Sequence, residues 1–392
     1  MSGPNTDKLP GKVLVFCRTS LLIICVLLLP AACHQAPSAK LYQQQLFAFG
    51  TLIDISLITD QPEQAQAAIN AVSHEFDRLH RLWHPWQGGE LASVNRQLPS
   101  LQAIPVSKEL ANLIPQSSQL SEQSNGLFNP AIGKLIRLWQ FDKLEDEKFN
   151  FSLPDPRKIQ KIVKSHPRMN DLKLTLTANN TYFLQSDNPA VSLDFGAYAK
   201  GVAIEKMLAI LKRYHINNAL INAGGDLKAI GSKALAGTST SWHIGIKNPQ
   251  NTLDPAQPAI LAAIDLHNGE ALFSSGDYER FFTFNNHHYH HIIDPRTGYP
   301  GQGVRAVTIL DTDAGQADAA ATAIFLAGPE LALDIARKMG IKHLLIMASD
   351  NRLYISPDMA ARLQLRVDYP VVILKDKKHV SAAQQNNTAN QK

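Results

Sequence analysis

Apolar and polar positions along this chain follow two periods, one typical of helices and one typical of strands. Residues 65–83 carry an apolar side chain at every third or fourth position, which predicts a helix with one buried stripe. Asp60 is its candidate N-cap, and Pro62 falls in its first turn. The same period predicts further helices over residues 107–124, 198–213, 316–327 and 330–339, the last two separated by Gly328-Pro329.

Segments with a period of two, or with short apolar runs, predict the strands. They are residues 47–58, 173–184, 190–195, 219–222 and 242–247. Two more pairs of strands are expected around Asn285-Asn286 and Asp350-Asn351, because such dipeptides suit hairpin turns. Since strands and helices alternate without a repeat or a Pro/Gly linker, the expected fold class is α/β, as one mixed α/β domain over residues 45–380.

Three segments are expected to lie outside this core. Residues 142–168 are polar, rich in lysine and interrupted by prolines, which predicts a surface excursion. Residues 381–392 are polar and predict a disordered tail. Basic residues before the apolar run 21–32, with Cys33 after it, resemble a bacterial lipoprotein signal. We therefore expect a signal peptide over residues 1–32, a lipidated Cys33 and a tether over residues 33–44.

That signal would place the protein on the periplasmic side of the cell envelope, anchored by lipid to a bacterial membrane. Pro30 is a departure, because Leu is usual three positions before the Cys. An ordinary cleaved signal or an uncleaved anchor are the alternatives. The apolar run of 12 residues is too short to cross a bilayer core of about 30 Å as a helix.

Composition narrows the function further. The net charge is only +4 and no block of Lys or Arg occurs, so no nucleic acid is expected as a partner. All three cysteines lie within the first 33 residues, which excludes a disulfide framework or a Cys-based metal site in the domain. Four histidines at positions 287, 288, 290 and 291 fall two on each face of a strand, so we expect most of them to be surface histidines rather than ligands of a transition metal.

Four segments could carry chemistry. Residues 192–201 predict a turn from a strand into a helix, where Asp194, Lys200 and free backbone amides could meet an anion; a capped turn with a solvated Lys is the alternative. Residues 222–226 hold a Gly-Gly pair that permits close approach of a ligand or forms a simple turn. Residues 273–280, followed by 291–298, gather polar side chains around tight turns.

The fourth segment is residues 316–323. Asp318 and Thr322 are four positions apart and share one helix face. A carboxylate and a hydroxyl are hard oxygen donors that suit Mg²⁺ beside phosphates, although Asp near a helix start is also ordinary. The flanking alanines predict that something large packs closely against this helix.

Taken in order, these segments resemble the ApbE family of FAD:protein FMN transferases. The match extends over about residues 45–350. It includes Phe49-Gly50-Thr51, Glu90-Leu91, Asn95, the segment Leu-Phe-Asn-Pro-Ala-Ile-Gly at 127–133, Leu138-Trp139 and the four segments above. The resemblance implies a mixed α/β fold with an FAD and Mg²⁺ site between sheet and helices. It also implies transfer of FMN from FAD to a Thr or Ser hydroxyl of a partner flavoprotein, through a phosphoester bond and with release of AMP.

The resemblance also implies residue roles. Asp318, Thr322 and the backbone carbonyl of Ala197 would hold Mg²⁺. His291 would be the general base on the acceptor hydroxyl, and Lys200 would stabilise phosphoryl charge. FAD as substrate would lie along Phe49, Leu127, Phe128, Asn129, Asp194 and Lys200, with Ser275 and Gly276 beside its phosphates.

Three departures bear on the ring contacts. The family's Phe-Asp-Pro is Phe128-Asn129-Pro130 here, which removes a charge; Trp83-His84-Pro85-Trp86 replaces the usual Ser-Thr-Tyr; and Phe49 replaces Met. Trp83 and Trp86 could stack on a ring or belong to the core. A lipid-anchored FAD carrier and an FAD pyrophosphatase are the alternative functions, but a carrier would have little use for the metal pair.

Overall fold

A sheet of nine strands forms the centre of the molecule, in the order β1-β2-β6-β7-β12-β15-β16-β17-β19. Neighbouring strands are antiparallel, except β17 and β19, which are parallel. The strands are β1 (Lys40–Ala48), β2 (Thr51–Thr59), β6 (Asn218–Ala223), β7 (Asp226–Ile230), β12 (Ala271–Gly276), β15 (Val304–Asp311), β16 (His343–Ala348), β17 (Leu353–Ile355) and β19 (Val371–Ile373).

The computed structural model describes residue 3 and residues 39–144, 152–235 and 238–375. All of these except Gly3 belong to one compact unit that begins at Ala39. The predicted signal peptide, Cys33 and the tail over residues 381–392 lie outside the described residues.

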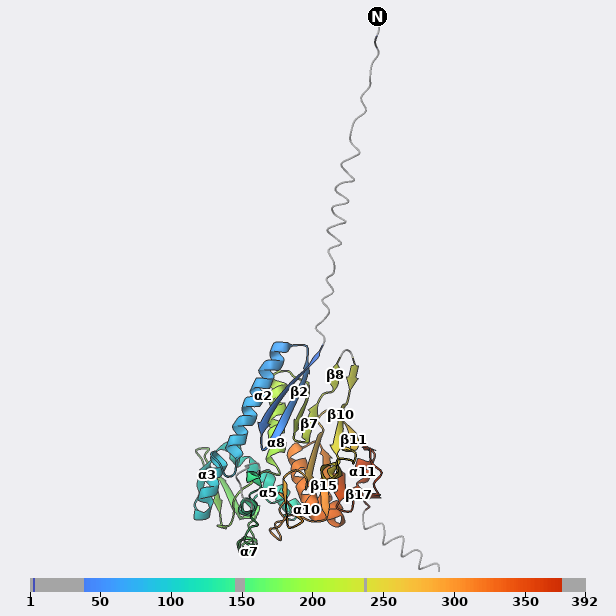
Figure 1. Cartoon of the computed structure of the whole chain (residues 1–392). Coiled ribbons are helices and arrows are strands. Elements are labelled where there is room, and N and C mark those ends of the chain that lie inside the picture. Colours follow the sequence, from blue (N-terminus) through green and yellow to red (C-terminus); the bar gives the residue numbers. More distant parts are fainter. Residues whose placement is uncertain (1–2, 4–38, 145–151, 236–237, 376–392) are drawn as a thin grey trace, which may run out of the picture. The chain divides into compact units, whose positions relative to one another are not determined.

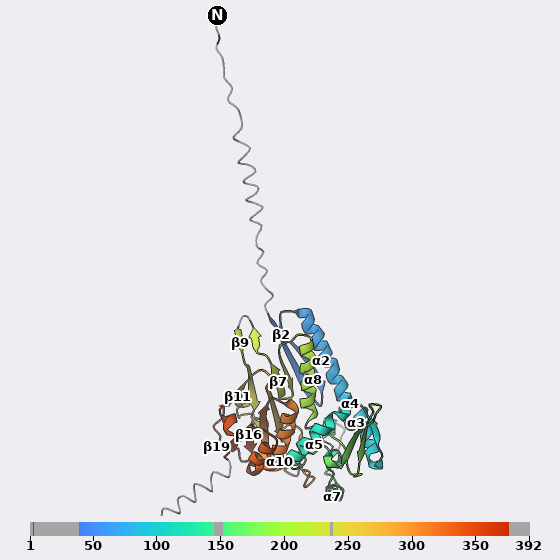
Figure 2. The same ribbon diagram turned by 180° about the vertical axis from the view of Figure 1, so that it is seen from behind.

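Three helices cover one face of the sheet: α2 (Pro62–Trp83), α8 (Ala199–Arg213) and α10 (Ala314–Lys338). Figures 1 and 2 show α2 and α8 side by side along this face. The apolar stripe predicted for α2 is buried from Ala65 to Trp83, and it packs with Ile53, Ile55 and Leu57 of β2. The predicted N-cap was wrong, since the cap position is Gln61, without a side-chain hydrogen bond.

The opposite face of the sheet is covered by a second, three-stranded sheet with its own apolar core. Its strands are β10 (Trp242–Lys247), β11 (Ile260–Leu266) and β18 (Gln364–Leu365). Smaller sheets pair β3 (Ile104–Val106) with β5 (Tyr182–Ser186) and β4 (Leu172–Leu176), β8 (Lys233–Leu235) with β9 (Thr238–Thr240), and β13 (Phe281–Phe284) with β14 (His287–His290). The remaining α-helices are α3 (Glu90–Gln97), α4 (Lys108–Ala111), α5 (Leu113–Gln123), α6 (Gly133–Trp139), α7 (Pro156–Lys164), α9 (Pro249–Leu253) and α11 (Pro357–Ala360).

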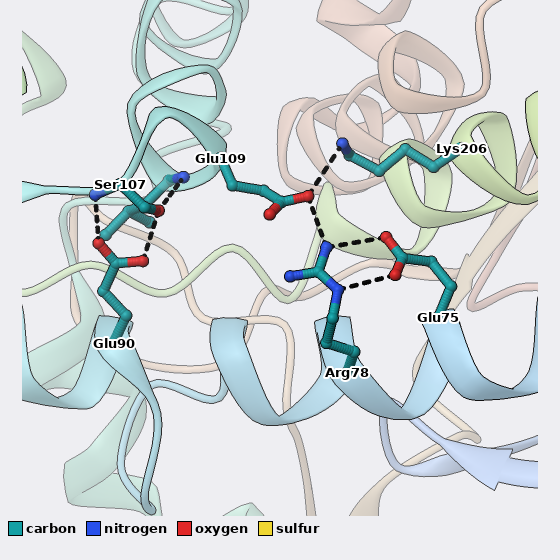
Figure 3. Close-up of polar contacts among 7 residues, drawn as sticks. Glu75, Arg78, Glu90, Ser107, Glu109 and Lys206 are labelled. Atoms are coloured by element: carbon teal, nitrogen blue, oxygen red, sulfur yellow. Dashed lines mark hydrogen bonds and ion pairs between the residues drawn. The ribbon is translucent and has the colours of Figure 1, made fainter. Parts of the chain in front are cut away.

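An ion-pair network connects α4 to helices α2 and α8 (Figure 3). Arg78 of α2 contacts Glu75 at 2.7 Å and Glu109 of α4 at 2.6 Å, and Lys206 of α8 lies 3.4 Å from the same Glu109 oxygen. The hydrogen bond from Arg78 is the main reason that the pKa of Glu109 is lowered. Beside it, Glu90 accepts bonds from the amide and hydroxyl of Ser107, the N-cap of α4.

Helix α10 is broken at Gly328, whose backbone is non-helical (φ 70°, ψ 172°), directly before Pro329. This confirms the two predicted helices on either side of that dipeptide. Within the described ranges, α10 alone is long and apolar enough to pass a composition test for a membrane span. Most of its first half is buried against the sheet and α8, so the core accounts for its apolar character.

Several strand predictions were wrong in detail. Residues 47–58 form a hairpin and not one strand, because Phe49 (φ 53°) and Gly50 (φ 71°) turn the chain between β1 and β2. Residues 40–44 therefore belong to the sheet and not to a tether. Residues 173–184 also divide, into β4 and β5, and residues 190–195 make only one bridge, from Ser192 to Ile132. The excursion at 142–168 contains α7.

Candidate active site

The centre of the candidate site is the contact between the start of α8 and the first half of α10. A Cβ on Gly201 would lie 2.2 Å from the carbonyl oxygen of Ala314, so only glycine permits this approach. Gly201 is the third residue of α8, so its amide belongs to the first turn and has no acceptor within the helix. It donates instead to Oδ2 of Asp318 at 3.2 Å, so the side chain of Asp318 in α10 caps the start of α8.

Lys200 is the buried cation of the site. Its Nζ lies 2.8 Å from Asp226 and 3.9 Å from Asp318, and all three side chains are largely buried. Burial lowers the pKa of Lys200, but the carboxylates of Asp226, Asp318 and Glu279 together raise it well above its usual value. Lys200 is therefore charged at neutral pH, and it is not the solvated lysine of the alternative interpretation.

Thr322 and Ser275 meet across the gap between α10 and β12. Their hydroxyl oxygens are 3.2 Å apart, one turn of helix beyond Asp318. Gly276 follows Ser275, and a Cβ there would lie 2.3 Å from the Tyr278 ring. The structure thus brings together Lys200, Ser275, Gly276, Asp318 and Thr322, which the sequence had placed in three separate segments.

These groups form a donor set that fits Mg²⁺. The carboxylate of Asp318, the hydroxyl of Thr322 and the backbone carbonyl of Ala197 are hard oxygen ligands. Burial raises the pKa of Asp318 to about 7, against the opposing effect of Lys200, so a dication there would favour the ionised form. No cluster of three His, Cys, Asp or Glu side chains exists in the part of the chain that the structure describes, which agrees with a site of mixed oxygen donors.

His291 lies behind this cluster with an unsatisfied ring nitrogen. Its Nδ1 is buried and has no hydrogen-bond partner among the described residues, and its Nε2 is 3.9 Å from Glu279. Burial first, then the positive charge of Arg280, holds the pKa of His291 well below 6.5. The imidazole is therefore neutral at neutral pH and able to accept a proton. Burial also raises the pKa of Glu279 to about 7.

The other histidines of this segment differ from the expectation. His290 is buried, bonds through Nε2 to the carbonyl of Gly301 at 2.8 Å, and has a pKa lowered to about 4 by burial. Only His287 is fully exposed. The prediction of surface histidines was therefore wrong for His290. The alternation of faces along the strand did not indicate that β14 ends at residue 290, where the chain returns to the core.

Phe49 occupies the turn between β1 and β2 at the edge of the site. Its amide donates to Nδ1 of His80 at 3.2 Å, and its ring packs against Phe76, His80 and Trp83. Arg280 lies against the same turn, 3.5 Å from the Phe49 carbonyl. Trp83 is 3% exposed and belongs to the core, whereas Trp86 is partly exposed, with Arg137 over its ring.

The predicted nucleotide contacts at 127–129 and Asp194 form a second group, next to the first. Leu127 and Phe128 are buried, and the Phe128 ring packs on Tyr198, which precedes α8. Asn129 donates to the carbonyl of Pro167 at 2.9 Å and accepts from the Ala131 amide at 3.0 Å, so both ends of its side-chain amide are bonded within the protein. Asp194 accepts from the Gly196 amide, and burial raises its pKa.

A cavity of about 540 Å³ opens beside Lys200 and Phe49. Asp226, Glu279 and Arg280 line it, together with Gly224 and Gly225 of the β6–β7 turn. None of these had been predicted as a site residue, although all lie in segments that the sequence marks as candidates. In the sequence, only its position after the Gly-Gly pair marks Asp226 as a candidate. Its ion pair with Lys200 could not be predicted, because the two residues are 26 positions apart and meet only in the folded chain.

Comparisons with known proteins agree with this geometry. The model of the ApbE family matches residues 49–345. An FAD:protein FMN transferase of Rhodobacter capsulatus is 35% identical over 321 residues, which are 82% of this chain and 58% of that protein. An FAD:protein FMN transferase of Treponema pallidum (strain Nichols) is 27% identical over 355 residues, 88% of this chain and 94% of that protein.

Two solved structures share the fold. The apbe protein from Thermotoga maritima superposes with a TM-score of 0.70 at 28% identity, over 82% of this chain and 99% of that one. The flavin transferase ApbE from Vibrio cholerae gives a TM-score of 0.68 at 23% identity, over 83% and 99%. Fold and site together define a transferase, the class of these curated relatives. The chain belongs to the ApbE family, which confirms the predicted family, fold class and class of enzyme.

Proposed function

We propose that this protein is a Mg²⁺-dependent FAD:protein FMN transferase, which attaches FMN from FAD to a Thr or Ser hydroxyl of a partner flavoprotein. The observation that carries the proposal is the contact of Asp318 with the first turn of α8, beside Lys200 and Thr322. It gathers a buried cation and three hard oxygen donors at one point, and phosphoryl transfer needs such groups around the phosphate oxygens. The names of the curated relatives support the same reaction.

In this reaction the acceptor hydroxyl attacks the phosphorus of the FMN half of FAD. A P–O bond to the Thr or Ser forms, the P–O bond to the AMP phosphate breaks, and AMP leaves with that electron pair. The hydroxyl proton passes to His291, whose ring is neutral because burial lowers its pKa. A general base of this kind typically contributes about 10²–10⁴-fold in rate. Lys200 stabilises the charge that grows on the phosphoryl oxygens.

The Ala197 carbonyl, Asp318 and Thr322 would hold Mg²⁺, which would supply further charge neutralisation on the phosphates. Ser275 lies beside that position, because its hydroxyl is 3.2 Å from that of Thr322, and Gly276 follows it in the chain. Phe49, Leu127, Phe128, Asn129 and Asp194 are assigned to binding the rest of the FAD, of which Phe49 is the one that lines the cavity.

The test is a transfer assay with the full chain. The protein is incubated with FAD, with and without Mg²⁺, and with purified extracytoplasmic flavoproteins as acceptors. Flavin fluorescence on the acceptor in a denaturing gel, together with AMP release that requires Mg²⁺, is the expected result. AMP and free FMN without labelled protein would instead identify a pyrophosphatase. Tight FAD binding without any AMP would identify a carrier.

We further propose that the protein acts from the outer side of a bacterial membrane, anchored through a lipidated Cys33. The apolar run before that Cys supports this location. A Cys33→Ser variant is expected to move from the membrane fraction to the periplasmic fraction, or to remain unprocessed. Retention of a fully processed Cys33→Ser protein in the membrane would contradict a lipid anchor at this residue.

A further inference from the structure

Strand β10 has one unpaired edge. It pairs with β11 on one side, and among the described strands none pairs with its other side. In an antiparallel pair, backbone N–H and C=O groups of alternate residues point to opposite sides. The free edge of β10 therefore presents hydrogen-bonding groups that another extended chain could use.

This free edge borders the cavity beside Lys200. All five residues from His243 to Lys247 line that cavity. Successive side chains of a strand point to opposite faces, so a cavity bordered by five consecutive residues runs along the strand's edge. Leu220 and Asn222 of β6 form the facing wall. Figure 1 shows β10 and β11 on the side of β7 away from α2 and α8.

A second cavity, of about 470 Å³, continues the first. Both are lined by Leu220, His243 and Ile244, and the second extends to Thr240 on one wall and Leu41 on the other. We call the two cavities together the β10 groove. The six residues of β10 span about 20 Å, at roughly 3.3 Å per residue, so the groove has the length of a short peptide and not of one side chain.

One end of the β10 groove lies at the proposed transfer site. Lys200, Glu279 and Arg280 line that end. His291 is adjacent, because its amide bonds to the Arg280 carbonyl and its Nε2 lies 3.9 Å from Glu279. Leu127, Asn129 and Asp194, which are assigned to FAD, line neither cavity. Phe49 and Lys200, which are also assigned to FAD, line the first cavity, so the groove meets the flavin site at this end.

Gly245 lies in the middle of the free edge. Its added Cβ would lie 2.9 Å from Cδ1 of Ile260, the far end of a flexible side chain, and at ordinary contact distance from Cγ1 and Cγ2, so packing against β11 does not require a glycine there. A glycine inside a strand often marks a place where another backbone approaches closely.

We propose that the β10 groove binds the acceptor polypeptide in an extended conformation, as a strand added to the edge of β10, with its target Thr or Ser at the Lys200 end. This inference rests on the proposed function, because only a transferase with a protein acceptor needs such a groove. Main-chain hydrogen bonds would provide affinity for segments of varied sequence. The flavin and the acceptor hydroxyl would meet at the Lys200 end of the groove.

The first test narrows the groove without touching the transfer site. Leu220→Trp fills its middle, and Leu331→Trp, at an exposed leucine of α10, is the matched control. With an acceptor protein that the wild type labels, Leu220→Trp is expected to raise the KM for the acceptor at least tenfold. FAD affinity and AMP release without acceptor should stay within twofold of wild type. An unchanged acceptor KM, or a loss of FAD affinity, would overturn the proposal.

Thr240→Trp provides the same test if Leu220→Trp fails to fold. This exposed position lies at the far end of the groove, so its substitution leaves the core intact. A raised acceptor KM with unchanged melting temperature is expected, and a wild-type KM counts against the groove.

The second test addresses the backbone directly. Twelve-residue peptides around the labelled Thr, each N-methylated at one position, are compared as acceptors. An added strand predicts that methylation at alternate positions abolishes labelling while the intervening positions tolerate it. Equal effects at all positions would exclude strand addition.

The two proposals fail in different ways. If the wild type labels no acceptor and releases no AMP, the transferase itself is excluded, and the groove proposal falls with it. If the wild type labels the acceptor and both tryptophan variants do so with the same KM, only the groove proposal is excluded.

Discussion

Individual side chains at the α8–α10 contact have been given different protonation states by their surroundings. Burial holds His291 neutral, whereas three carboxylates keep the equally buried Lys200 charged. A neutral base and a fixed cation are therefore available at the same pH, within one cluster. This division of roles depends on single contacts, so it can be tested one residue at a time.

Asp318→Ala is expected to lower transfer at least 100-fold while part of the FAD affinity remains. The substitution removes the only carboxylate of the proposed metal site and the acceptor for the Gly201 amide. Asp334→Ala removes an exposed carboxylate from the same helix and should leave transfer within twofold. Rates are measured by gel fluorescence and affinity by flavin titration. Full turnover in Asp318→Ala would remove this residue from the metal site.

His291→Ala is expected to slow transfer by about 10²–10⁴-fold with FAD affinity nearly unchanged, because the residue acts on the acceptor proton. His287→Ala changes an exposed histidine four positions earlier and serves as the control. The measurement is the rate with saturating FAD, together with the dissociation constant of FAD. If FAD binding is lost instead, His291 is a binding residue.

At the scale of elements, the approach of α8 to α10 fixes the site. Gly201 permits the contact, and its first-turn amide, which has no acceptor within α8, is satisfied by Asp318 of α10. The alanines around Asp318 are buried, as the Ala-rich sequence predicted, and the large elements packed against them are α8 and the sheet.

Gly201→Ala is expected to destabilise the protein by about 3 kcal/mol, because its Cβ would lie 2.2 Å from a backbone oxygen that cannot move alone. Lys212→Ala, exposed on the same helix, should change the free energy of unfolding by less than about 0.5 kcal/mol. Urea unfolding curves measure both. Equal midpoints for the two variants would mean that the helices separate easily.

The spacing of apolar residues correctly predicted those helices and turns whose apolar positions are the buried ones in the structure. The stripe of α2 and the Asn285-Asn286 turn, with both residues at positive φ, are examples. It failed at residues 47–58, because β1 is a polar edge strand and the turn at Phe49-Gly50 resembles strand sequence. For the site, the shared helix face of Asp318 and Thr322 could be predicted from their i, i+4 spacing. The partnership of Lys200 with Asp226 could not, since it arises only when α8 packs beside β7.

At the scale of the whole molecule, buried ionisable groups link stability to pH. His290 is one such group, and it is not one of the proposed metal ligands. Its pKa is about 4 in the folded chain and about 6.5 in the unfolded chain. Between these values the unfolded chain binds a proton that the folded chain does not. Its contribution to stability is therefore complete above pH 6.5 and is lost as the pH falls toward 4.

His290→Gln is expected to remove this dependence. Between pH 6.5 and pH 4, the free energy of unfolding of the wild type should fall by about 3 kcal/mol more than that of the variant. This follows from a pKa difference of about 2.5, since each pKa unit corresponds to about 1.36 kcal/mol. Unfolding free energies of both proteins across this range provide the measurement, and the difference cancels other titrating groups. Parallel pH profiles would show that His290 is protonated in the folded chain.

The position of α10 has a consequence for how this protein ages and is inactivated. The helix that carries Asp318 and Thr322 is also among the most buried parts of the core, and it is not a surface loop. Damage that loosens the core therefore also displaces Asp318 and Thr322 from the other residues of the site. A partly inactivated preparation should consist of fully competent molecules and dead ones, with a falling number of active sites and an undiminished turnover at each site that survives.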